Sequence, residues 1–384
     1  MKIISITTDP NAGGSSKSLL ILINGLKKLG HDVLVIIPKS GFLCDNLKMY
    51  NIPYLTVPTV KVSIWPRLKN INDIIKFLPR LIYGQCCKYI TQRKIKSIAK
   101  TYNPDIIHSN VSLFTDGYKV ALDLGIKHVW HIREYGDLDF GLNIYPSKKL
   151  HNAKLQKGYT IAITQGIKKY FNLSNDRNIV IYNGIKSKYQ KLQNKEKDNY
   201  WLFVGHVNEN KGVSDLIEAY IGYRAHGGDK RLLIVGHYDE NYKNKLQKSL
   251  KQHNIEQYVE FLGQRNDIDY LMQKAFALIV PSKYEAFGRI TAEAMLNNCL
   301  VIGRNTAGTK EQIELGNNEI GKEIAFLFND VKELMDTLLA VDKLNNNEYL
   351  DMISLAKEYA LNNYTTEKNI ELTEKFFYKV LNTK

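Results

Sequence analysis

Two glutamates eight positions apart, Glu285 and Glu293, flank a Phe-Gly turn in the segment KYEAFGRITAEAM, residues 283–295. On one helix, eight residues make about 2.2 turns, so the side chains would lie about 80° apart around the axis. If the helix begins near Phe287, Glu285 lies in the preceding loop, and both carboxylates could bind one elongated ligand across the helix N-terminus. Alternatively, Glu285 is a simple first-turn acid and Glu293 a surface residue. The residues alone leave both interpretations open.

Two further loops could bind an anion. Residues 9–18, DPNAGGSSKS, include Gly14 and could direct backbone N–H groups and a positive helix end towards a phosphate or sugar. The loop matches neither a Walker A nor a G-x-G-x-x-G motif, and a tight turn with a serine cap would explain it nearly as well. In residues 205–212, GHVNENKG, Lys211 is well placed for a phosphate and His206 could add a second donor. A solvated loop lysine is the alternative.

The elements that must position these residues are short apolar runs alternating with amphipathic stretches. KIISIT, DVLVIIP, DIIHSN, HVWHI, YTIAIT and NIVIYN are predicted strands of the first half, and YWLFVG, RLLIVG, YVEFLG, FALIVP and CLVIG of the second. This order indicates an α/β fold with parallel sheets covered on both faces. Because a polar run at 188–199 separates the two sets, we expect a domain at 1–187, a second at 188–355, and a helical segment at 356–384 that could pack back on the N-terminal domain.

Glycines end several predicted strands of the second half: Gly205, Gly236, Gly263 and Gly303. Ligands of such sheets lie beyond the carboxyl ends of the strands, where glycine lets the backbone approach a ligand or merely permits the turn. Four such glycines in successive units favour a ligand-binding edge.

Residues 200–312 resemble the donor domain of retaining GT-B glycosyltransferases, in particular family 4. YWLFVGHVNENKG, LLIVGH, FLGQRND and VPSKYEAFGRITAEAM match its strand-Gly, Lys-Gly, strand-Gly, Phe-x-Gly and Pro-Ser-x-x-Glu-x-Phe-Gly elements in order and spacing. The likeness extends weakly into the first half through three stretches: the loop at residues 9–18 (the GG loop), AITQGIKKYF and IYNGI. The resemblance implies two Rossmann-like domains with parallel sheets facing across a cleft, the N-terminal one binding the acceptor and the C-terminal one the nucleotide sugar.

The resemblance also implies roles for individual residues. Glu285 would bind hydroxyls of the donor sugar, and Glu293 would hold the ribose of its nucleotide. Lys211 would neutralise the diphosphate leaving group. The expected donor-binding set further contains Gly14, His206, Gly236, Arg265, Phe287, Gly288 and Arg289.

One residue departs from the family pattern, which usually has arginine where this chain has His206. A neutral imidazole stabilises a departing diphosphate less than a fixed guanidinium does. Either His206 binds protonated, another base such as Arg289 or Arg265 assists, or activity is low.

In the first half, HVWHIRE ends a predicted strand with His131, Arg133 and Glu134. A histidine at a strand end is more often structural. The resemblance implies that His131 points towards the interdomain cleft and contacts the donor sugar near the reacting carbon, so it joins Glu285 and Lys211 as a catalytic candidate. Arg133 and Glu134 could equally form a local ion pair.

Two Asp-x-Asp pairs, Asp137/Asp139 and Asp267/Asp269, could suggest a metal-held nucleotide sugar. Among 39 acidic residues such pairs arise by chance, and the resembled family holds its diphosphate with basic groups and a helix end. We therefore expect no metal and no cofactor, with the nucleotide sugar as co-substrate.

The net charge of +14 is concentrated in one half of the chain. Residues 1–185 contain 26 Lys/Arg and 11 Asp/Glu. Within this range, residues 61–100 contain ten basic residues and one acidic residue. Apolar residues at helical spacing in 61–100 suggest docking on an anionic membrane, where a polyprenyl-linked sugar would be the acceptor. Pro79 should end or bend a helix there. An ordinary helix pair with its apolar face packed inwards is the alternative.

The expected cellular location rests on three features: spanning helices, a secretion signal and the pattern of cysteines. No stretch approaches the roughly 20 apolar residues of a spanning helix, and the N-terminus reads as a first strand instead of a secretion signal. The four cysteines have neither zinc-ligand spacing nor disulfide density. We expect a cytoplasmic protein, peripheral on the inner face of the cell membrane.

The family resemblance, taken with these patterns, implies a retaining, metal-independent glycosyltransferase. It would move a sugar from a nucleotide diphosphate sugar, with a UDP-sugar favoured, to a glycan or lipid-linked saccharide in bacterial surface polysaccharide assembly, such as capsule or lipopolysaccharide. A catalytically weak sugar-nucleotide-binding subunit is the alternative. Nucleic-acid binding would use the basic half, but no recognition motif supports it.

Overall fold

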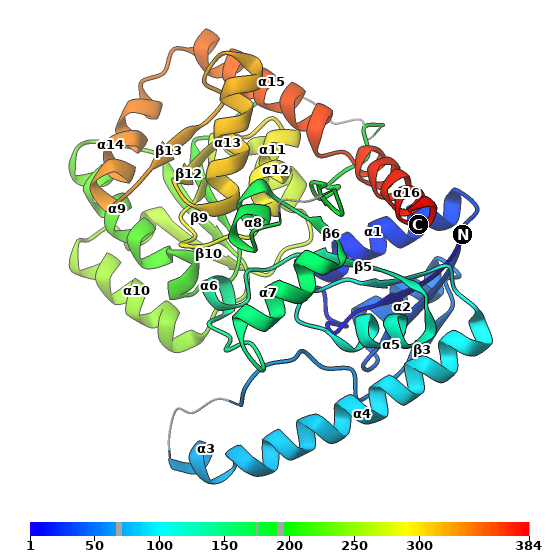
Figure 1. Cartoon of the computed structure of the whole chain (residues 1–384). Helices are drawn as coiled ribbons and strands as arrows, with labels where there is room; N and C mark the ends of the chain where they lie inside the picture. The colour runs from blue at the N-terminus through cyan, green and yellow to red at the C-terminus, as the bar shows by residue number, and fades with distance from the viewer. Residues whose placement is uncertain (67–70, 174–175, 190–195, 384) are drawn as a thin grey trace. The chain divides into compact units, whose positions relative to one another are not determined.

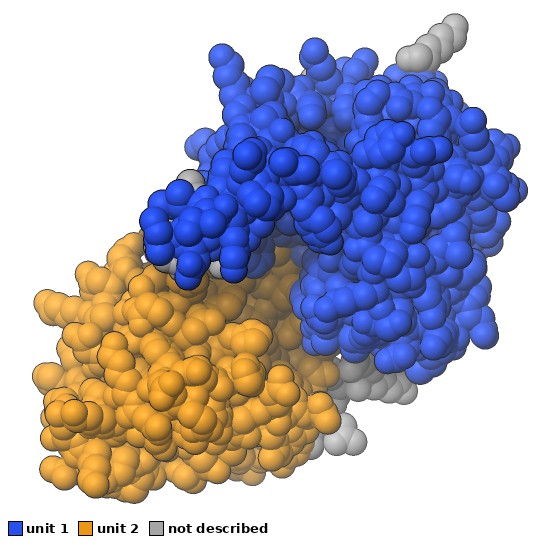
Figure 2. All heavy atoms as spheres, turned by 90° about the horizontal axis from the view of Figure 1, so that it is seen from below, with its two compact units in different colours: residues 1–184, 366–384 blue, residues 185–365 orange. Residues whose placement is uncertain are grey.

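The computed structural model describes residues 1–66, 71–173, 176–189 and 196–383. Parts of the predicted membrane segment (67–70) and of the predicted linker (190–195) therefore lie outside the described residues. The chain forms two compact units, coloured separately in Figure 2. Unit 1 contains residues 1–184 and 366–384, and unit 2 contains residues 185–365.

Unit 1 is built on a seven-stranded parallel sheet in the order β3-β2-β1-β4-β5-β6-β7. Its strands are β1 (Lys2–Ile6), β2 (Asp32–Ile37), β3 (Tyr54–Thr56), β4 (Ile106–Ser109), β5 (Lys127–Ile132), β6 (Tyr159–Ala162) and β7 (Asn178–Val180). Its helices are α1 (Gly14–Lys28), α2 (Phe42–Met49), α3 (Ile71–Ile75), α4 (Phe77–Tyr102), α5 (Asp116–Leu124), α6 (Asp137–Phe140), α7 (Lys148–Lys157), α8 (Gln165–Tyr170) and α16 (Thr366–Asn382).

Successive side chains of β1 point to opposite faces of the sheet, and apolar residues occur on both faces. Ile3 packs into a core with residues of α1 and α16, whereas Ile4 and Ile6 pack into a separate core with residues of α4 and α5. Because both faces of the sheet are buried, the inner positions of β1 are apolar except Ser5, whose hydroxyl lies 2.9 Å from Nδ1 of His108. The C-terminal helix α16 lies alongside α1 (Figure 1), and a Cβ on Gly25 would fall 2.1 Å from Cδ1 of Ile370.

Unit 2 repeats the design with a six-stranded parallel sheet in the order β10-β9-β8-β11-β12-β13. Its strands are β8 (Tyr200–Val204), β9 (Arg231–Val235), β10 (Val259–Gly263), β11 (Ala277–Val280), β12 (Leu300–Arg304) and β13 (Phe326–Phe328). Its helices are η1 (Glu209–Lys211), α9 (Val213–Ala225), α10 (Glu240–Gln252), η2 (Glu256–Tyr258), α11 (Ile268–Lys274), α12 (Arg289–Leu296), α13 (Ala307–Ile320), α14 (Val331–Asp342) and α15 (Asn346–Asn363). The predicted α/β class with two doubly wound parallel sheets is confirmed.

The basic segment of unit 1 forms α3 and the long helix α4, whose start is drawn away from the sheet in Figure 1. The helical stretch is interrupted at Lys76, between α3 and α4, so the predicted break lies just before Pro79. Pro79 itself lies in the first turn of α4, where its missing N–H would have no partner within the helix. Among the described residues, no helix is both long and apolar enough to cross a membrane.

Candidate functional site

The carboxyl edge of the unit 2 sheet brings loop backbones into unusually close approach. Gly236 follows β9 with φ of 140°, and a Cβ there would lie 1.8 Å from the carbonyl oxygen of Gly205. Gly212 has φ of 67°, and its Cβ would lie 2.0 Å from the carbonyl oxygen of Pro281. Only glycine fits these two positions, so the loops after β8, β9 and β11 pack directly on one another.

Lys211 and Glu285 meet across two of these loops. Asn208 caps the short helix η1, accepting a hydrogen bond from the Lys211 backbone N–H at 3.0 Å. The Lys211 Nζ lies 2.5 Å from Oε1 of Glu285, and the two side chains are 31% and 20% exposed. The ion pair is thus only partly screened by solvent, which strengthens it relative to a surface pair.

A buried amide fixes the turn between Glu285 and α12. The Gln312 side chain, on α13, donates from Nε2 to the carbonyl oxygens of Phe287 and Gly288. The Gly308 N–H donates to the carbonyl oxygen of Glu285 at 2.8 Å. These bonds orient the turn and leave the positive end of α12, which carries no acidic side chain in its first turn, as a place for an anionic group.

Glu293 lies one turn into α12, four residues after Arg289. The Arg289 Nη2 lies 3.4 Å from Oε1 of Glu293, and the side chains are 18% and 25% exposed. Burial lowers the pKa of the Arg289 guanidinium, and the Glu293 charge opposes this shift. Glu293 therefore follows Glu285 along the same loop and helix, as the sequence predicted, and keeps exposed carboxylate surface.

The remaining expected donor residues are more spread out. His206 is exposed after β8, with its ring edge-on to His237 at 5.8 Å. Arg265 follows β10 and donates to both carboxylate oxygens of Asp267, at 2.9 and 2.7 Å. Gly14 belongs to unit 1, where it begins α1.

His131 is fully buried in β5 of unit 1. Its Nδ1 lies 3.3 Å from Nη2 of Arg133, and its ring lies edge-on to His108 at 5.6 Å. Burial first, and then the nearby Arg133 and His108, hold its pKa well below the ordinary value, so the ring is neutral. Its contact with a sugar stays a prediction, and it would require the ring to gain an exposed edge.

Arg133 and Glu134 are each held by neutral partners. The Arg133 guanidinium donates to the side-chain oxygens of Asn110 at 2.8 Å and Asn183 at 2.5 Å. Glu134 Oε1 accepts from the backbone N–H and the hydroxyl of Ser112, both at 2.8 Å. Burial raises the pKa of Glu134 to about 7.

The polar partners in this network were not predicted from the sequence. Asn110 donates to the carbonyl oxygen of Ser15, which ties the network to the GG loop. Asn110 and Ser112 follow β4, and Asn183 follows β7. Their positions after the ends of strands were the one feature of the sequence that could have marked them as candidates.

Both Asp-x-Asp pairs are engaged within the protein. Asp139 accepts backbone N–H groups of Tyr135 and Gly136, and Asp269 pairs with Lys186 at 2.7 Å. Over the described part of the chain, no group of three or more His, Cys, Asp or Glu is arranged to hold a metal.

Comparison with known proteins gives matches over both units. Residues 184–358 match the family described as Glycosyl transferases group 1, and residues 12–189 match Glycosyltransferase Family 4. An uncharacterized glycosyltransferase of Methanocaldococcus jannaschii is 30% identical, with 73% of this chain and 77% of that protein covered. The O-antigen chain mannosyltransferase RfbU of Salmonella typhimurium is 32% identical over 38% of this chain and 40% of that protein.

Solved structures show the same fold over the whole chain. The HepE protein of Anabaena, crystallised with UDP, superimposes with a TM-score of 0.77 at 18% identity, covering 99% of this chain and 100% of that one. A glycosyltransferase from Rickettsia africae gives a TM-score of 0.79 at 20% identity, covering 100% and 99%.

Proposed function

Because this chain belongs to the group 1 glycosyltransferases and has the GT-B fold, we propose that it transfers a sugar with retention from a nucleotide diphosphate sugar to a glycan or lipid-linked saccharide. The observation that carries this proposal is the Lys211–Glu285 ion pair beside the N-terminus of α12. A UDP-sugar is the favoured donor, since the similar HepE structure contains UDP.

On donor binding, the contact between Lys211 and Glu285 would be replaced by a contact from each side chain to the donor. Its diphosphate would take Lys211 and the positive end of α12, and its sugar hydroxyls would take the carboxylate of Glu285. Glu293, further along α12, would bind the ribose hydroxyls. The Lys211 backbone N–H is bonded to Asn208 independently of this exchange, so the lysine would already be positioned when the leaving group departs.

Transfer would then occur on one face of the sugar. The acceptor hydroxyl attacks the anomeric carbon from the side on which the diphosphate leaves, the carbon–oxygen bond to the diphosphate breaks, and the hydroxyl proton passes to a departing phosphate oxygen. Lys211 stabilises the negative charge that develops on this group. In this proposal the basic groups and the helix end neutralise the diphosphate without a metal ion.

The acceptor half suggests where the reaction takes place. Unit 1 carries the basic segment 61–100, and exposed apolar side chains lie along α3 and α4. An O-antigen chain mannosyltransferase is among the relatives. We therefore place the enzyme in bacterial surface polysaccharide assembly, bound peripherally to the inner face of the cell membrane.

Thermal unfolding with UDP, GDP, ADP and CMP, each with and without EDTA, tests the donor site. We expect UDP to raise the melting temperature, EDTA to leave this shift unchanged, and Glu293→Ala to abolish it. Transfer to an acceptor, followed by NMR of the product, should show the anomeric configuration of the donor. A shift that persists in Glu293→Ala, or an inverted product, would contradict the proposal.

A second candidate is a weakly active sugar-nucleotide-binding subunit. His206, at the position where the family usually has arginine, favours it. In that case the purified chain binds UDP but turns over no donor, and His206→Arg raises turnover. Full activity of the purified wild-type chain would exclude this candidate.

A further inference from the structure

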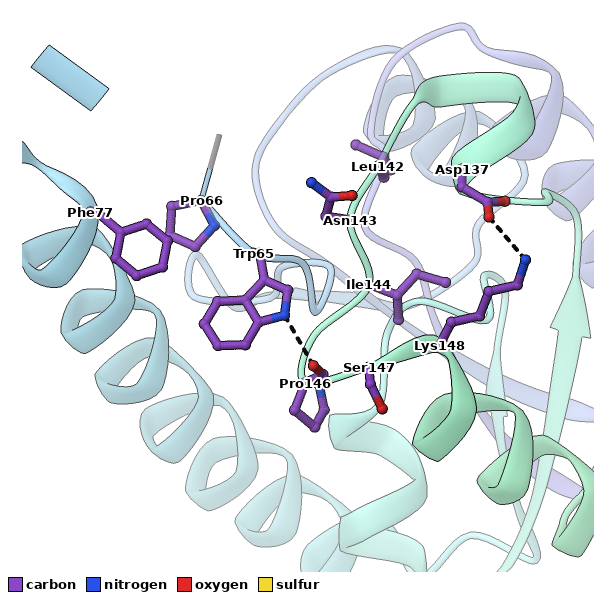
Figure 3. A pocket seen from close by; sticks show the side chains of 10 residues that line it. All are labelled: Trp65, Pro66, Phe77, Asp137, Leu142, Asn143, Ile144, Pro146, Ser147 and Lys148. Atoms are coloured by element: carbon purple, nitrogen blue, oxygen red, sulfur yellow. Dashed lines mark hydrogen bonds and ion pairs between the residues drawn. The ribbon is translucent and has the colours of Figure 1, made fainter. Parts of the chain in front are cut away.

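Unit 1 contains a cavity of about 670 Å³ that the donor chemistry does not use (Figure 3). Its walls come from residues 65–66, the start of α4, and residues 137–148. The first of these segments follows β3, and the last follows β5. The cavity therefore lies beyond the carboxyl ends of the strands, the edge where parallel sheets bind ligands.

An aromatic wall is fixed on one side of this cavity. The Trp65 ring lies parallel to Phe77, with centroids 6.0 Å apart, and edge-on to Tyr145 at 4.6 Å. The Trp65 Nε1 donates to the carbonyl oxygen of Pro146 at 3.0 Å, and its backbone N–H donates to that of Asn143 at 2.8 Å. Trp65 and Phe77 remain partly exposed although they are held on several sides.

A polar group lies on the other side. Lys148, the first residue of α7, places its Nζ 3.0 Å from Oδ2 of Asp137. The Tyr170 hydroxyl donates to the same carboxylate. Figure 3 shows Asp137 and Lys148 facing each other across from the Trp65 and Phe77 rings. This side offers donors and acceptors with little net charge.

The aromatic wall continues into an exposed apolar surface. Phe77 is flanked in the sequence by Ile74 and Ile75 of α3 and by Leu78 of α4, whose exposures are 60%, 68% and 62%. Lys76 adds positive charge to the same stretch, whereas Arg80 pairs with Asp73 at 2.7 Å. A ligand that fills the cavity and passes Phe77 would meet apolar side chains.

We propose that this cavity binds the saccharide of an amphipathic glycoside, the acceptor of the transfer proposed above, on which this inference rests. The C–H face of the sugar packs on Trp65 and Phe77, its hydroxyls bond to Asp137 and Lys148, and its apolar aglycone leaves past Phe77 towards α3 and α4. A purely apolar ligand would leave the Asp137–Lys148 side unused, and an anionic one would meet the Asp137 carboxylate.

The tryptophans provide a built-in reporter. The chain has three, and Trp130 and Trp201 have no exposed surface, so a ligand in the cavity reaches Trp65 alone. Octyl glucoside, galactoside, mannoside and N-acetylglucosaminide are titrated into the full chain below their micelle concentrations. Octanol serves as the control for the apolar tail, and Trp65→Phe as the control for the reporter. We expect a saturable change in emission with at least one glycoside, none with octanol, and none in Trp65→Phe.

A second variant separates recognition from folding. Asp137→Asn keeps the shape of the side chain, and we expect it to weaken glycoside binding at least tenfold by calorimetry. The UDP-induced rise in melting temperature should be unchanged in both variants, so loss of the donor site and loss of this cavity are distinguishable. The proposal fails if no glycoside in the panel gives a saturable change, if octanol gives the same change, or if Asp137→Asn binds as the wild type does.

Discussion

The Lys211 Nζ atom lies 2.5 Å from Oε1 of Glu285, although the two residues are 74 positions apart. Lys211 ends the loop after β8, and Glu285 follows β11. These two strands are neighbours in the unit 2 sheet, at the point where the strand order reverses. A nucleotide sugar bound at this switch point would find a cation and a carboxylate already held together.

This pairing predicts that Lys211→Met reduces turnover far more than it reduces stability. Removing one preorganised charge from a developing anion costs about 10²–10³ in kcat. Steady-state kinetics with a UDP-sugar would measure the loss. Lys283→Met is the matched control, because Lys283 lies beside the same loop but pairs with Glu209 at 3.3 Å on the exposed surface. Equal losses in the two variants would contradict the assigned role.

Much of this arrangement could be predicted from the sequence, because it depends on local patterns. Apolar runs of four or more residues marked the longer strands, and the motif spacing marked Glu285 and Glu293. Of the three-residue edge strands, β7 was predicted from its longer run NIVIYN, whereas β3 and β13 were missed because YLT and FLF are too short to show a periodicity.

The part that could not be predicted arises from tertiary packing. Gln312 supports the turn at Phe287 only because α13 packs against it, and no spacing in the sequence announces this contact. The same holds for Asn110 and Ser112, whose partners Arg133 and Glu134 directly follow the neighbouring strand β5. Buried polar partners of this kind are set by which strands pair, and local patterns do not encode that.

The close approach at Gly212 predicts a strong effect of a single methyl group. Gly212→Ala should lower the free energy of unfolding by more than about 2 kcal/mol, because left-handed backbone strain of about 1–2 kcal/mol adds to overlap with Pro281. Gly227→Ala is the control for strain alone, since Gly227 has φ of 89° and nothing within 4 Å of its Cβ position. Urea unfolding of both variants would measure the difference. If the two substitutions cost the same, the close approach is not what selects glycine at 212.

The buried carboxyl of Glu134 predicts a specific pH dependence. Burial raises its pKa from 4.5 to about 7, so folding favours the protonated form. Its contribution to stability is complete below pH 4.5 and is lost as the pH rises through about 7, a change of about 3 kcal/mol. Glu134→Gln keeps a neutral side chain, so its stability relative to the wild type should rise across this window.

The measurement must be a difference between the two proteins. The buried His108, His128 and His131 have lowered pKa values, so they destabilise the fold as the pH falls, which is the opposite slope. Both proteins retain these histidines, and their contribution cancels. A difference in unfolding free energy that does not change between pH 4.5 and 7 would show that folding does not raise the pKa of Glu134.

The exposed apolar side chains of α3 and α4 predict binding to anionic membranes. Transferring one leucine side chain from water to an apolar environment contributes about 1.5–3 kcal/mol, so Leu78→Ser should weaken vesicle binding about tenfold or more. Basic residues near these side chains should make binding stronger on phosphatidylglycerol than on phosphatidylcholine vesicles, and weaker as salt increases. Co-sedimentation with both vesicle types would measure this.

Leu122→Ser provides the matched control, because Leu122 on α5 of the same unit is 60% exposed and Leu78 is 62% exposed. Each substitution removes a leucine side chain of similar exposure, but from a different helix of unit 1. If Leu122→Ser weakens binding as much as Leu78→Ser does, adsorption is unspecific. If neither does, the apolar side chains of α3 and α4 do not enter the membrane, and the basic charge alone must account for any attraction to it.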